Sequence, residues 1–156
     1  MGSKRKQKIV KQREFPSNSK KAITTENPDA YYSQKPAWNF ASCDTKMWPF
    51  TKDHIGDLFW IEILPYLQSL EKMVWQDILL GAKKQNHSID PESFNTKAQR
   101  RLEELHIEAE SIISLRLNGT HRIYGYIVGR VFYILWFDEN HGDNDSCVCR
   151  SHKKHT

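Results

Sequence analysis

The stretch LRLNGTHRIYGYIVGRVFYILWFDENH, from Leu115 to His141, decides the fold of this chain. It is rich in apolar, β-branched and aromatic residues, which favour strands. We expect three of them: 112–117, 121–127 and 131–137. Asn118-Gly119 and Val128-Gly129 separate these runs, and such dipeptides are typical of tight hairpin turns. The stretch therefore predicts an antiparallel meander.

Alternation along each strand assigns its side chains to the two faces of the sheet. In the second strand, one face carries Arg122, Tyr124 and Tyr126, and the opposite face carries Ile123 and Ile127. The third strand, VFYILWF, is apolar on both faces, so we expect it in the middle of the sheet with cover on each side. Either the aromatic N-terminal segment or a partner protein is expected to cover the second face.

Helical periodicity precedes the strands. Residues 53–70 carry apolar side chains at spacings of three and four, which predicts an amphipathic helix. Pro65 either kinks this helix or begins a second one, because proline lacks a backbone donor. Further helices are expected over 69–80 and after a cap at Asn95 or Thr96. The predicted fold class is α+β, with an antiparallel sheet packed against N-terminal helices.

Charge divides the chain into an arm and a body. The segment 1–22 carries eight lysines and arginines against Glu14 alone, a charge of +7, which leaves −3 for the remainder of a chain of net charge +4. Its 156 residues suffice for one ordinary domain. We expect a basic, disordered arm over 1–22, an irregular aromatic extension over 23–51 and an α+β domain over 52–156.

We expect a cytoplasmic protein, because the sequence shows no recognisable signal peptide or membrane span and its cysteines form no regular framework. The charged start is not followed by an apolar run, and no window approaches the roughly 20 apolar residues of a membrane span. The three cysteines, Cys43, Cys147 and Cys149, are an odd number without a regular framework. We therefore expect reduced thiols and no membrane partner.

Arg122 is the first candidate functional residue. It shares a strand face with Tyr124 and Tyr126, and a guanidinium beside phenols is a suitable platform for phosphates and bases. A structural interpretation is also open, in which Arg122 forms an ion pair and the tyrosines cap the sheet.

A second cluster lies near the C-terminus and contains His141, Arg150, His152, Lys153, Lys154 and His155. Imidazoles titrate near neutral pH, so this end can supply acid–base groups and phosphate contacts. A zinc site is a second interpretation, with ligands from His141, Cys147, Cys149, His152 and His155. The Cys-x-Cys spacing departs from the usual zinc pairing. A disordered charged tail is the third interpretation.

The order of these elements, with LRLNGTHRIYGY followed by an apolar strand and a basic end, resembles the RelE/ParE toxin superfamily over 52–156. Its mRNA-cleaving members carry an arginine and a tyrosine on this hairpin. By position, the resemblance implies five candidate catalytic residues: Arg122 as the hairpin arginine, His152 or His155 as a terminal imidazole, and Glu103 or Glu104 as a helix-borne carboxylate. Ile113 and Ser114 stand where other members place a lysine pair.

The function implied by the resemblance is metal-independent cleavage of mRNA by a ribosome-associated toxin without a cofactor, restrained by an antitoxin protein. A base among Glu103, Glu104 and His155 would take the 2′-hydroxyl proton, and an imidazole or ammonium would protonate the leaving oxygen. Further contacts to RNA are expected from Arg116, Tyr124, Tyr126, Arg150, Lys153 and Lys154. Two other classes stay open: a non-catalytic RNA- or protein-binding module, and a toxin against another target such as gyrase.

Overall fold

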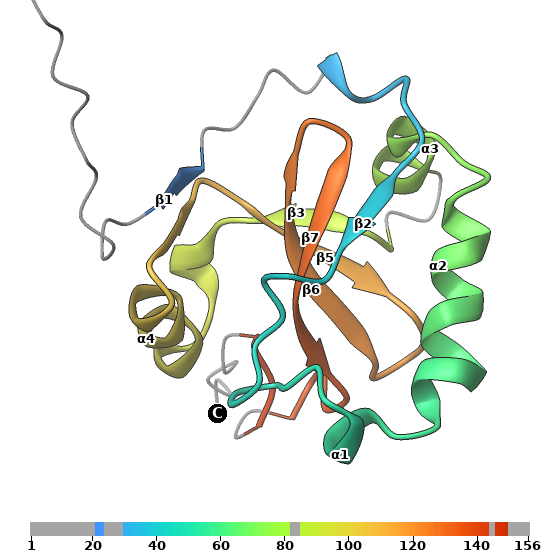
Figure 1. Ribbon diagram of the computed structural model, residues 1–156. Helices are drawn as coiled ribbons and strands as arrows, with labels where there is room; N and C mark the ends of the chain where they lie inside the picture. The colour runs from blue at the N-terminus through green and yellow to red at the C-terminus, as the bar shows by residue number, and fades with distance from the viewer. Residues whose placement is uncertain (1–20, 24–29, 82–84, 144–145, 150–156) are drawn as a thin grey trace, which may run out of the picture.

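The computed structural model of the chain describes residues 21–23, 30–81, 85–143 and 146–149. At its centre is a five-stranded sheet in the order β2-β7-β6-β5-β3 (Figure 1). Its strands are β2 (Ala37–Asn39), β3 (His87–Ile89), β5 (Ile112–Arg116), β6 (Arg122–Val128) and β7 (Val131–Asp138). Only β2 runs parallel to its neighbour, and the other pairs are antiparallel. The predicted meander is confirmed.

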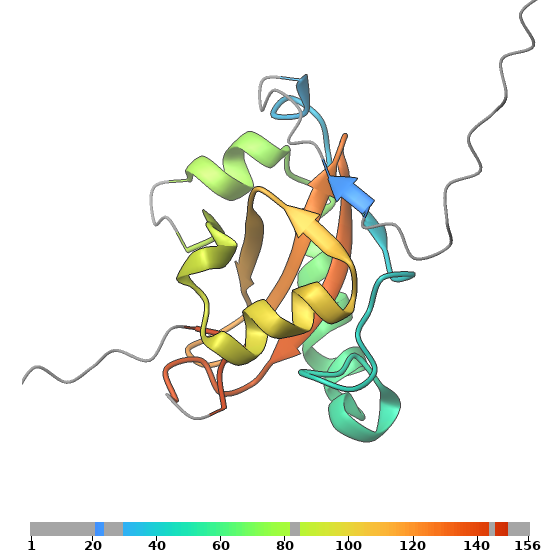
Figure 2. The ribbon, with the colours of Figure 1, turned by 90° about the vertical axis from the view of Figure 1, so that its left-hand side faces the viewer.

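Helices lie on both sides of this sheet. The first group is α1 (Lys52–Ile55), the π-helix η2 (Phe59–Ile63), α2 (Leu64–Leu70) and α3 (Trp75–Leu80). The 3₁₀ turn η3 (Pro91–Ser93) and α4 (Thr96–Glu104) follow, and α4 lies across the face turned toward the viewer in Figure 2. A separate parallel pair joins β1 (Lys21–Ile23) to β4 (Ile107–Ala109). No helix in the described part of the chain has the length and apolar content needed to cross a membrane.

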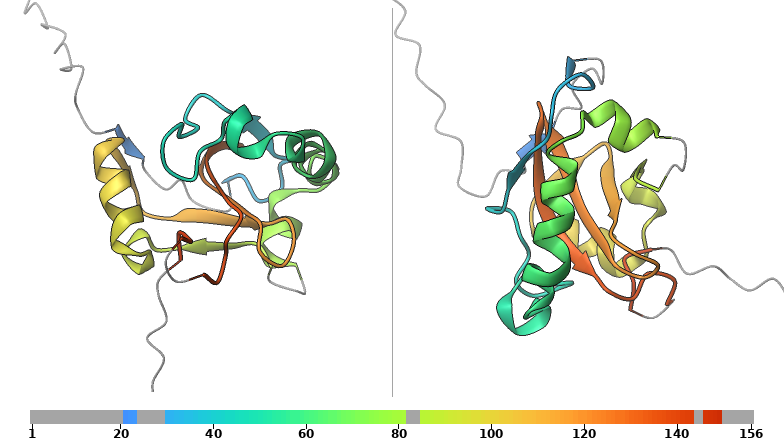
Figure 3. Two further views of the ribbon diagram at one scale, coloured as in Figure 1. Left: turned by 90° about the horizontal axis from the view of Figure 1, so that it is seen from below. Right: turned by 90° about the vertical axis from the view of Figure 1, so that its right-hand side faces the viewer.

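Strand β7 is covered on both faces, as its sequence predicts. Phe132, Ile134 and Phe137 belong to the core shared with α2 and α3. Leu135 and Trp136 belong to a second core, which α4 covers (Figure 3). The expectation that the aromatic N-terminal segment or a partner protein covers this second face was therefore incomplete. The main cover is α4, because its apolar stripe faces β7.

The N-terminal segment still contributes to both cores. Trp38 packs against the core on the α2 side, and Trp48 packs against Trp136 on the α4 side with ring centroids 5.1 Å apart. These aromatic rings lie beside β7, the strand that pairs with the edge strand β2. Both tryptophans therefore hold the N-terminal segment against the sheet.

A buried ion pair locks the same segment to α4. The carboxylate of Asp44 accepts hydrogen bonds from Arg101 Nε at 2.7 Å, Arg101 Nη2 at 2.8 Å and Trp136 Nε1 at 3.0 Å. Burial opposes ionisation, but these hydrogen bonds hold the pKa of Asp44 below its usual value. The bidentate geometry suits a guanidinium. One carboxylate thus joins the N-terminal segment, α4 and β7.

At two glycines with positive φ, a helix end and a turn lie at other residues than the sequence predicts. Gly56, at φ 55°, ends α1, so the continuous helix expected over 53–70 was wrong at this point. The chain becomes helical again at η2, and Pro65 falls in the first turn of α2, one of the two positions expected for it. Gly129, at φ 60°, is the first central residue of the β6–β7 turn, one residue later than predicted.

The β5–β6 turn is longer than the two-residue Asn118-Gly119 reversal that the sequence predicts. Leu117 N donates to His121 O at 3.1 Å, which closes a loop over 118–120. Asn118 Oδ1 accepts from the backbone N–H groups of Thr120 and His121, both at 2.9 Å. An asparagine that binds the backbone two and three residues ahead forms its own turn, and this overrides the shorter hairpin geometry.

A β-bulge interrupts the pairing of β6 with β7. Tyr124 pairs with Trp136 and Gly125 pairs with Ile134, so Leu135 has no partner on β6. Leu135 and Trp136 therefore both face α4. The bulge brings the backbone of β7 onto Gly125, where an added Cβ would meet the carbonyl of the neighbouring strand and lie 2.7 Å from Phe132 Cζ.

Gly125→Ala is expected to destabilise the protein by roughly 3 kcal/mol, because a buried methyl group has no space and must displace β7. The measurement is the free energy of unfolding in urea. Gly119→Ala is the matched control, since nothing lies within 4 Å of its Cβ position, and it should change stability by less than about 0.5 kcal/mol. Equal stability of the two variants would contradict the steric overlap expected for a Cβ at Gly125.

Candidate active site

The sheet face under α4 carries a row of charged residues at one end. In the register of the sheet, Arg116 on β5 pairs with Arg122 on β6, and Arg122 pairs with Asp138 on β7. In the adjacent row Ser114 pairs with Tyr124. Residues two apart on a strand share a face, so Arg116, Arg122 and Tyr124 are brought together as the sequence predicts.

The guanidinium of Arg122 is buried, with 7% of the residue exposed. Its Nη1 donates to the carbonyl of Asn118 at 2.5 Å and to that of His121 at 3.0 Å. Burial lowers the pKa of Arg122, and the neighbouring charge of Arg116 lowers it further. No carboxylate among the described residues forms an ion pair with Arg122, so the structural ion pair considered from the sequence is not found there.

Asp138 lies opposite Arg122 but its carboxylate has other partners. One oxygen accepts from Asn140 N at 2.9 Å and the other accepts from Val148 N at 2.8 Å. The side chain is fully buried, and this burial raises the pKa of Asp138 although Arg122 acts in the opposite direction. Asp138 therefore holds the chain that follows β7, and the positive charge of Arg122 is left incompletely balanced.

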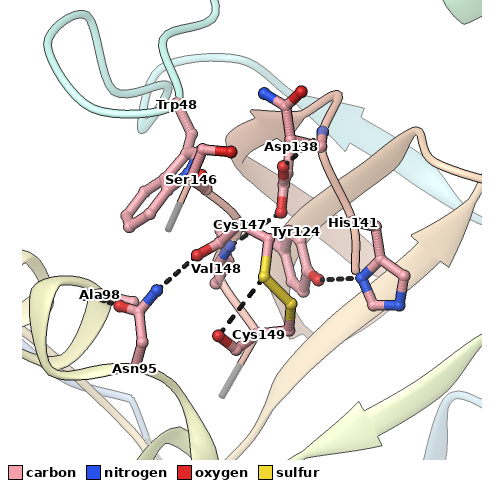
Figure 4. Close-up of a disulfide and its surroundings, with 11 residues drawn as sticks. Trp48, Asn95, Ala98, Tyr124, Asp138, His141, Ser146, Cys147, Val148 and Cys149 are labelled. Carbon is pink, nitrogen blue, oxygen red and sulfur yellow. Dashed lines mark hydrogen bonds between the residues drawn. A yellow bond between two sulfur atoms is a disulfide. The ribbon is translucent and has the colours of Figure 1, made fainter. Parts of the chain in front are cut away.

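His141 is the imidazole that the structure brings to this face. Its Nδ1 lies 3.4 Å from the hydroxyl oxygen of the buried Tyr124 (Figure 4). Burial lowers the pKa of His141, and the charges of Arg122, His87 and Arg116 lower it further. A desolvated imidazole among cations favours its neutral form. The surroundings of His141 therefore favour the neutral imidazole.

A pocket of about 510 Å³ opens beside these residues, and its lining includes His87, Tyr124, His141 and Asp90. His87 is exposed on β3 and comes from a segment far from His141 in the sequence. The carboxylate of Asp90 accepts a hydrogen bond from Glu92 N at 2.9 Å, where it caps η3. Two imidazoles thus line one pocket. Arg116 and Arg122 are not part of its lining, but both are near enough to act electrostatically on His141. Such a set can bind a phosphate and move protons.

The segment 146–149 lies along one side of the pocket. Cys147 and Cys149 form a disulfide, so the expectation of reduced thiols was wrong for these two residues (Figure 4). Asn95, the cap of α4, donates from Nδ2 to the carbonyl of Cys147. Cys43 is the free cysteine, and burial raises the pKa of its thiol to about 12. Cys149 lines the pocket beside His141.

The zinc interpretation finds no support in the described part of the chain, where no three His, Cys, Asp or Glu side chains gather as metal ligands do. Two of its proposed ligands, Cys147 and Cys149, are joined in the disulfide. The other two at the end of the chain, His152 and His155, lie outside the described residues.

Tyr126 does not join the pocket. Its hydroxyl oxygen lies 3.0 Å from Ser42 Oγ, and its ring stacks on Tyr133 with centroids 5.2 Å apart. The exposed fractions of Tyr124 and Tyr126 are 1% and 7%. Neither ring has a face open to a base, so the expected stacking platform is not present on β6. The reason is α4, which buries this face.

The two predicted carboxylates, Glu103 and Glu104, lie at the C-terminal end of α4. Glu104 accepts from Arg101 Nη1 at 2.8 Å, and Glu103 is exposed on the same last turn. In the described part of the chain neither forms a hydrogen bond or ion pair with Arg122 or His141. The structure thus does not bring the helix-borne acids to the arginine. The remaining predicted residues, Arg150, His152, Lys153, Lys154 and His155, lie outside the described residues.

Sequence reasoning missed His87, and it placed His141 in the C-terminal cluster but not among the five candidate catalytic residues. His141 comes three residues after the end of β7 at Asp138, and a histidine just beyond a central strand was the available signal. His87 offered none, because its strand of three residues, His-Ser-Ile, is too short to show a period. Only the pairing of His87 with Ser114 brings it to this face.

The pKa of His141, measured by NMR titration of the ring protons, is expected below the ordinary 6.5. Because the folded state binds this proton less tightly than the unfolded chain, stability should fall as the pH drops through 6.5 toward the folded value. Arg116→Gln should move the pKa upward, since it removes a repelling charge. Arg100→Gln, an exposed change on α4, is the control and should leave the pKa in place. An unshifted pKa in wild type would contradict the proximity of the cations.

Comparison of the chain with protein-family models, with curated proteins and with solved structures finds no match in any of the three. The function is therefore argued from the geometry and charge of the pocket.

Proposed function

We propose that this protein is a metal-independent endoribonuclease of the toxin type that cleaves mRNA in the cytoplasm, in association with the ribosome. The observation that carries the proposal is the buried guanidinium of Arg122, which has no carboxylate partner among the described residues and lies beside Arg116 and the neutral imidazole of His141. Asp138 balances this charge only in part, because its carboxylate is bound by two backbone N–H groups, and an incompletely balanced buried cation favours an anionic ligand. The RNA backbone offers such an anion at every phosphate.

His141 is the proposed general base, in place of Glu103 or Glu104. With Nδ1–H donating to Tyr124 Oη, the free Nε2 takes the proton of a ribose 2′-hydroxyl. The 2′-oxygen then bonds to the adjacent phosphorus, and the bond from phosphorus to the 5′-oxygen breaks. Burial raises the pKa of Tyr124, so its phenol stays neutral and can accept this hydrogen bond.

His87 is the proposed general acid. It lines the pocket from β3, the strand next to β5, and its protonated ring would give a proton to the departing 5′-oxygen. The products are a 2′,3′-cyclic phosphate and a 5′-hydroxyl, so the two imidazoles exchange protonation states without a metal. His152 and His155 stay candidates for the same role.

Arg122 and Arg116 are proposed to stabilise the charge that grows on the non-bridging phosphate oxygens. Nη1 of Arg122 is held by two carbonyls, while Nε and Nη2 form no hydrogen bond with the described residues. Preorganised donors of this kind stabilise a transition state because they need no rearrangement when charge develops. The basic arm of charge +7 supports attraction of RNA and ribosome by its charge alone.

An exposed apolar patch supports the proposed antitoxin partner. Trp60 and Ile61 are 67% and 73% exposed on η2, and the exposed ring of Phe40 packs against Phe59 of the same turn. A pocket of about 420 Å³ lies beside this patch and is lined by Phe50 and Phe59, among others. Apolar patches next to a hollow are typical of surfaces that bind another protein.

Arg122→Ala is expected to lower cleavage by at least about 10²-fold, the cost of removing one preorganised charge-stabilising group. Mapping of transcript 5′ ends after induction is the measurement, with Arg100→Ala as the control and circular dichroism to confirm folding. Arg122→Lys, which keeps the charge, tests the same point if the alanine variant does not fold. Intact cleavage would exclude the role. Growth arrest with unchanged transcripts would indicate another target such as gyrase, and RNA bound without cleavage would indicate a binding module.

His141→Asn is expected to lower kcat by roughly 10²- to 10⁴-fold, because it removes the base while an amide still reaches Tyr124. In wild type, kcat should rise with pH through the lowered pKa of His141, since only the neutral ring accepts the proton. Rates measured on a short RNA across pH 4 to 8 test both points. His106→Asn, on the loop after α4, serves as the control. A wild-type rate that does not change with pH, or full activity of His141→Asn, would contradict the assignment.

A further inference from the structure

The loop over 118–120 contacts all three of the groups to which the proposed mechanism gives the base and phosphate roles. The carbonyl of Asn118 accepts from Arg122 Nη1 at 2.5 Å and from Arg116 Nε at 3.3 Å. The carbonyl of Thr120 accepts from the backbone N–H of His141 at 3.0 Å. A shift of this loop would therefore displace both guanidiniums and the imidazole together.

The loop is in turn held by one carboxylate from the helical side of the sheet. Glu62 Oε1 accepts from Asn118 Nδ2 at 2.5 Å, and the two oxygens of Glu62 lie 3.0 and 2.8 Å from His121 Nδ1. The side chains of Glu62 and His121 are both largely buried, at 21% and 19% exposed, so water screens the pair only in part. The His121 ring also packs edge-on against Phe137 of β7.

Glu62 reaches the loop from the π-helical turn η2. This turn closes with a hydrogen bond from Leu64 N to Phe59 O, five residues apart, and then continues into α2. Ile63 is fully buried on the core side of the turn, while Trp60 and Ile61 point to solvent. Such π turns are rare and are frequently found at functional sites. No other described carboxylate forms a hydrogen bond with Asn118 or His121.

We propose that Glu62, acting through Asn118 and His121, is the positioning residue of the nuclease site. It clamps the 118–120 loop to η2 and so keeps Arg116, Arg122 and His141 in one arrangement. Its role is indirect, because its carboxylate contacts neither guanidinium and lies against the loop. The inference rests on the proposed function for its catalytic meaning, while the geometric part can be tested without it.

Glu62→Gln is the sharpest test. The variant keeps the size of the side chain and one oxygen for Asn118, but it replaces the second oxygen and the charge that face His121. We expect kcat on a short RNA to fall by about 10²-fold, the loss typical of a displacement of about 1 Å in catalytic groups, while KM changes less than threefold. The melting temperature should stay within a few degrees, which separates positioning from loss of fold.

The matched control is Asp57→Asn, which removes an exposed carboxylate just before η2 and should leave kcat unchanged. His121→Gln removes the other partner of the clamp and should reproduce the loss, and it takes the place of Glu62→Gln if that variant does not fold. Combining the two changes should cost little more than either alone, because both release the same loop.

NMR supplies a readout that does not depend on activity. In Glu62→Gln the resonances of the Arg122 guanidinium should broaden or shift, and the pKa of His141 should rise toward its ordinary value as the cations move away. If wild type does not cleave RNA, the proposed function fails, and these spectra alone decide the geometric inference. Unchanged spectra in Glu62→Gln, or an unchanged kcat in a cleaving protein, would overturn the positioning role.

Discussion

Strand β7 is buried on both of its faces, and this constraint decides where the helices of the described chain lie. A strand with aromatic and branched residues at nearly every position cannot leave either face to water without losing the free energy of apolar burial. One face packs against α2 and α3 and the other packs against α4. The Asp44–Arg101 pair then joins the N-terminal segment to α4 beside Trp136. The candidate site lies at the end of β7, where this cover stops.

The charges of the site follow from that placement. Asp138 is the last residue of β7, and its carboxylate is hydrogen-bonded to the chain that follows it, so it balances the charge of Arg122 only in part. Arg116 and Arg122 are held instead by carbonyl groups of one loop. Carbonyl dipoles orient a guanidinium without cancelling its charge, which leaves a net positive site for an anion. Burial lowers the pKa of His141, and the neighbouring charges of Arg122, His87 and Arg116 lower it further.

The β5–β6 loop connects η2, on one side of the sheet, to the guanidiniums of Arg116 and Arg122. The apolar patch of Trp60 and Ile61 and the carboxylate of Glu62 are neighbours on the same π-helical turn. A protein bound to the patch would therefore contact the turn that holds the loop, and the loop holds the cationic groups. On the proposed function, this arrangement gives an antitoxin a route to the site that does not require it to fill the RNA pocket.

Local chemistry was sufficient to predict part of this protein from its sequence. Alternation in β5, β6 and β7 predicted the meander and the common face of Arg116, Arg122 and Tyr124, because a strand has a fixed period of two. The Asn95 cap of α4 was likewise visible, because its side chain acts on a neighbour three residues away.

Tertiary structure decided the rest, since it depends on contacts between distant segments. The pairing of β3 with β5 brings His87 to the pocket, and Ser42 and Tyr133 contact Tyr126, whose burial the strand pattern alone left open. The bulge at Leu135 and the clamp of Glu62 on His121 join residues with no shared periodicity. A residue's strand face follows from its neighbours in the chain, but its charge balance and burial follow from whichever segment packs against it.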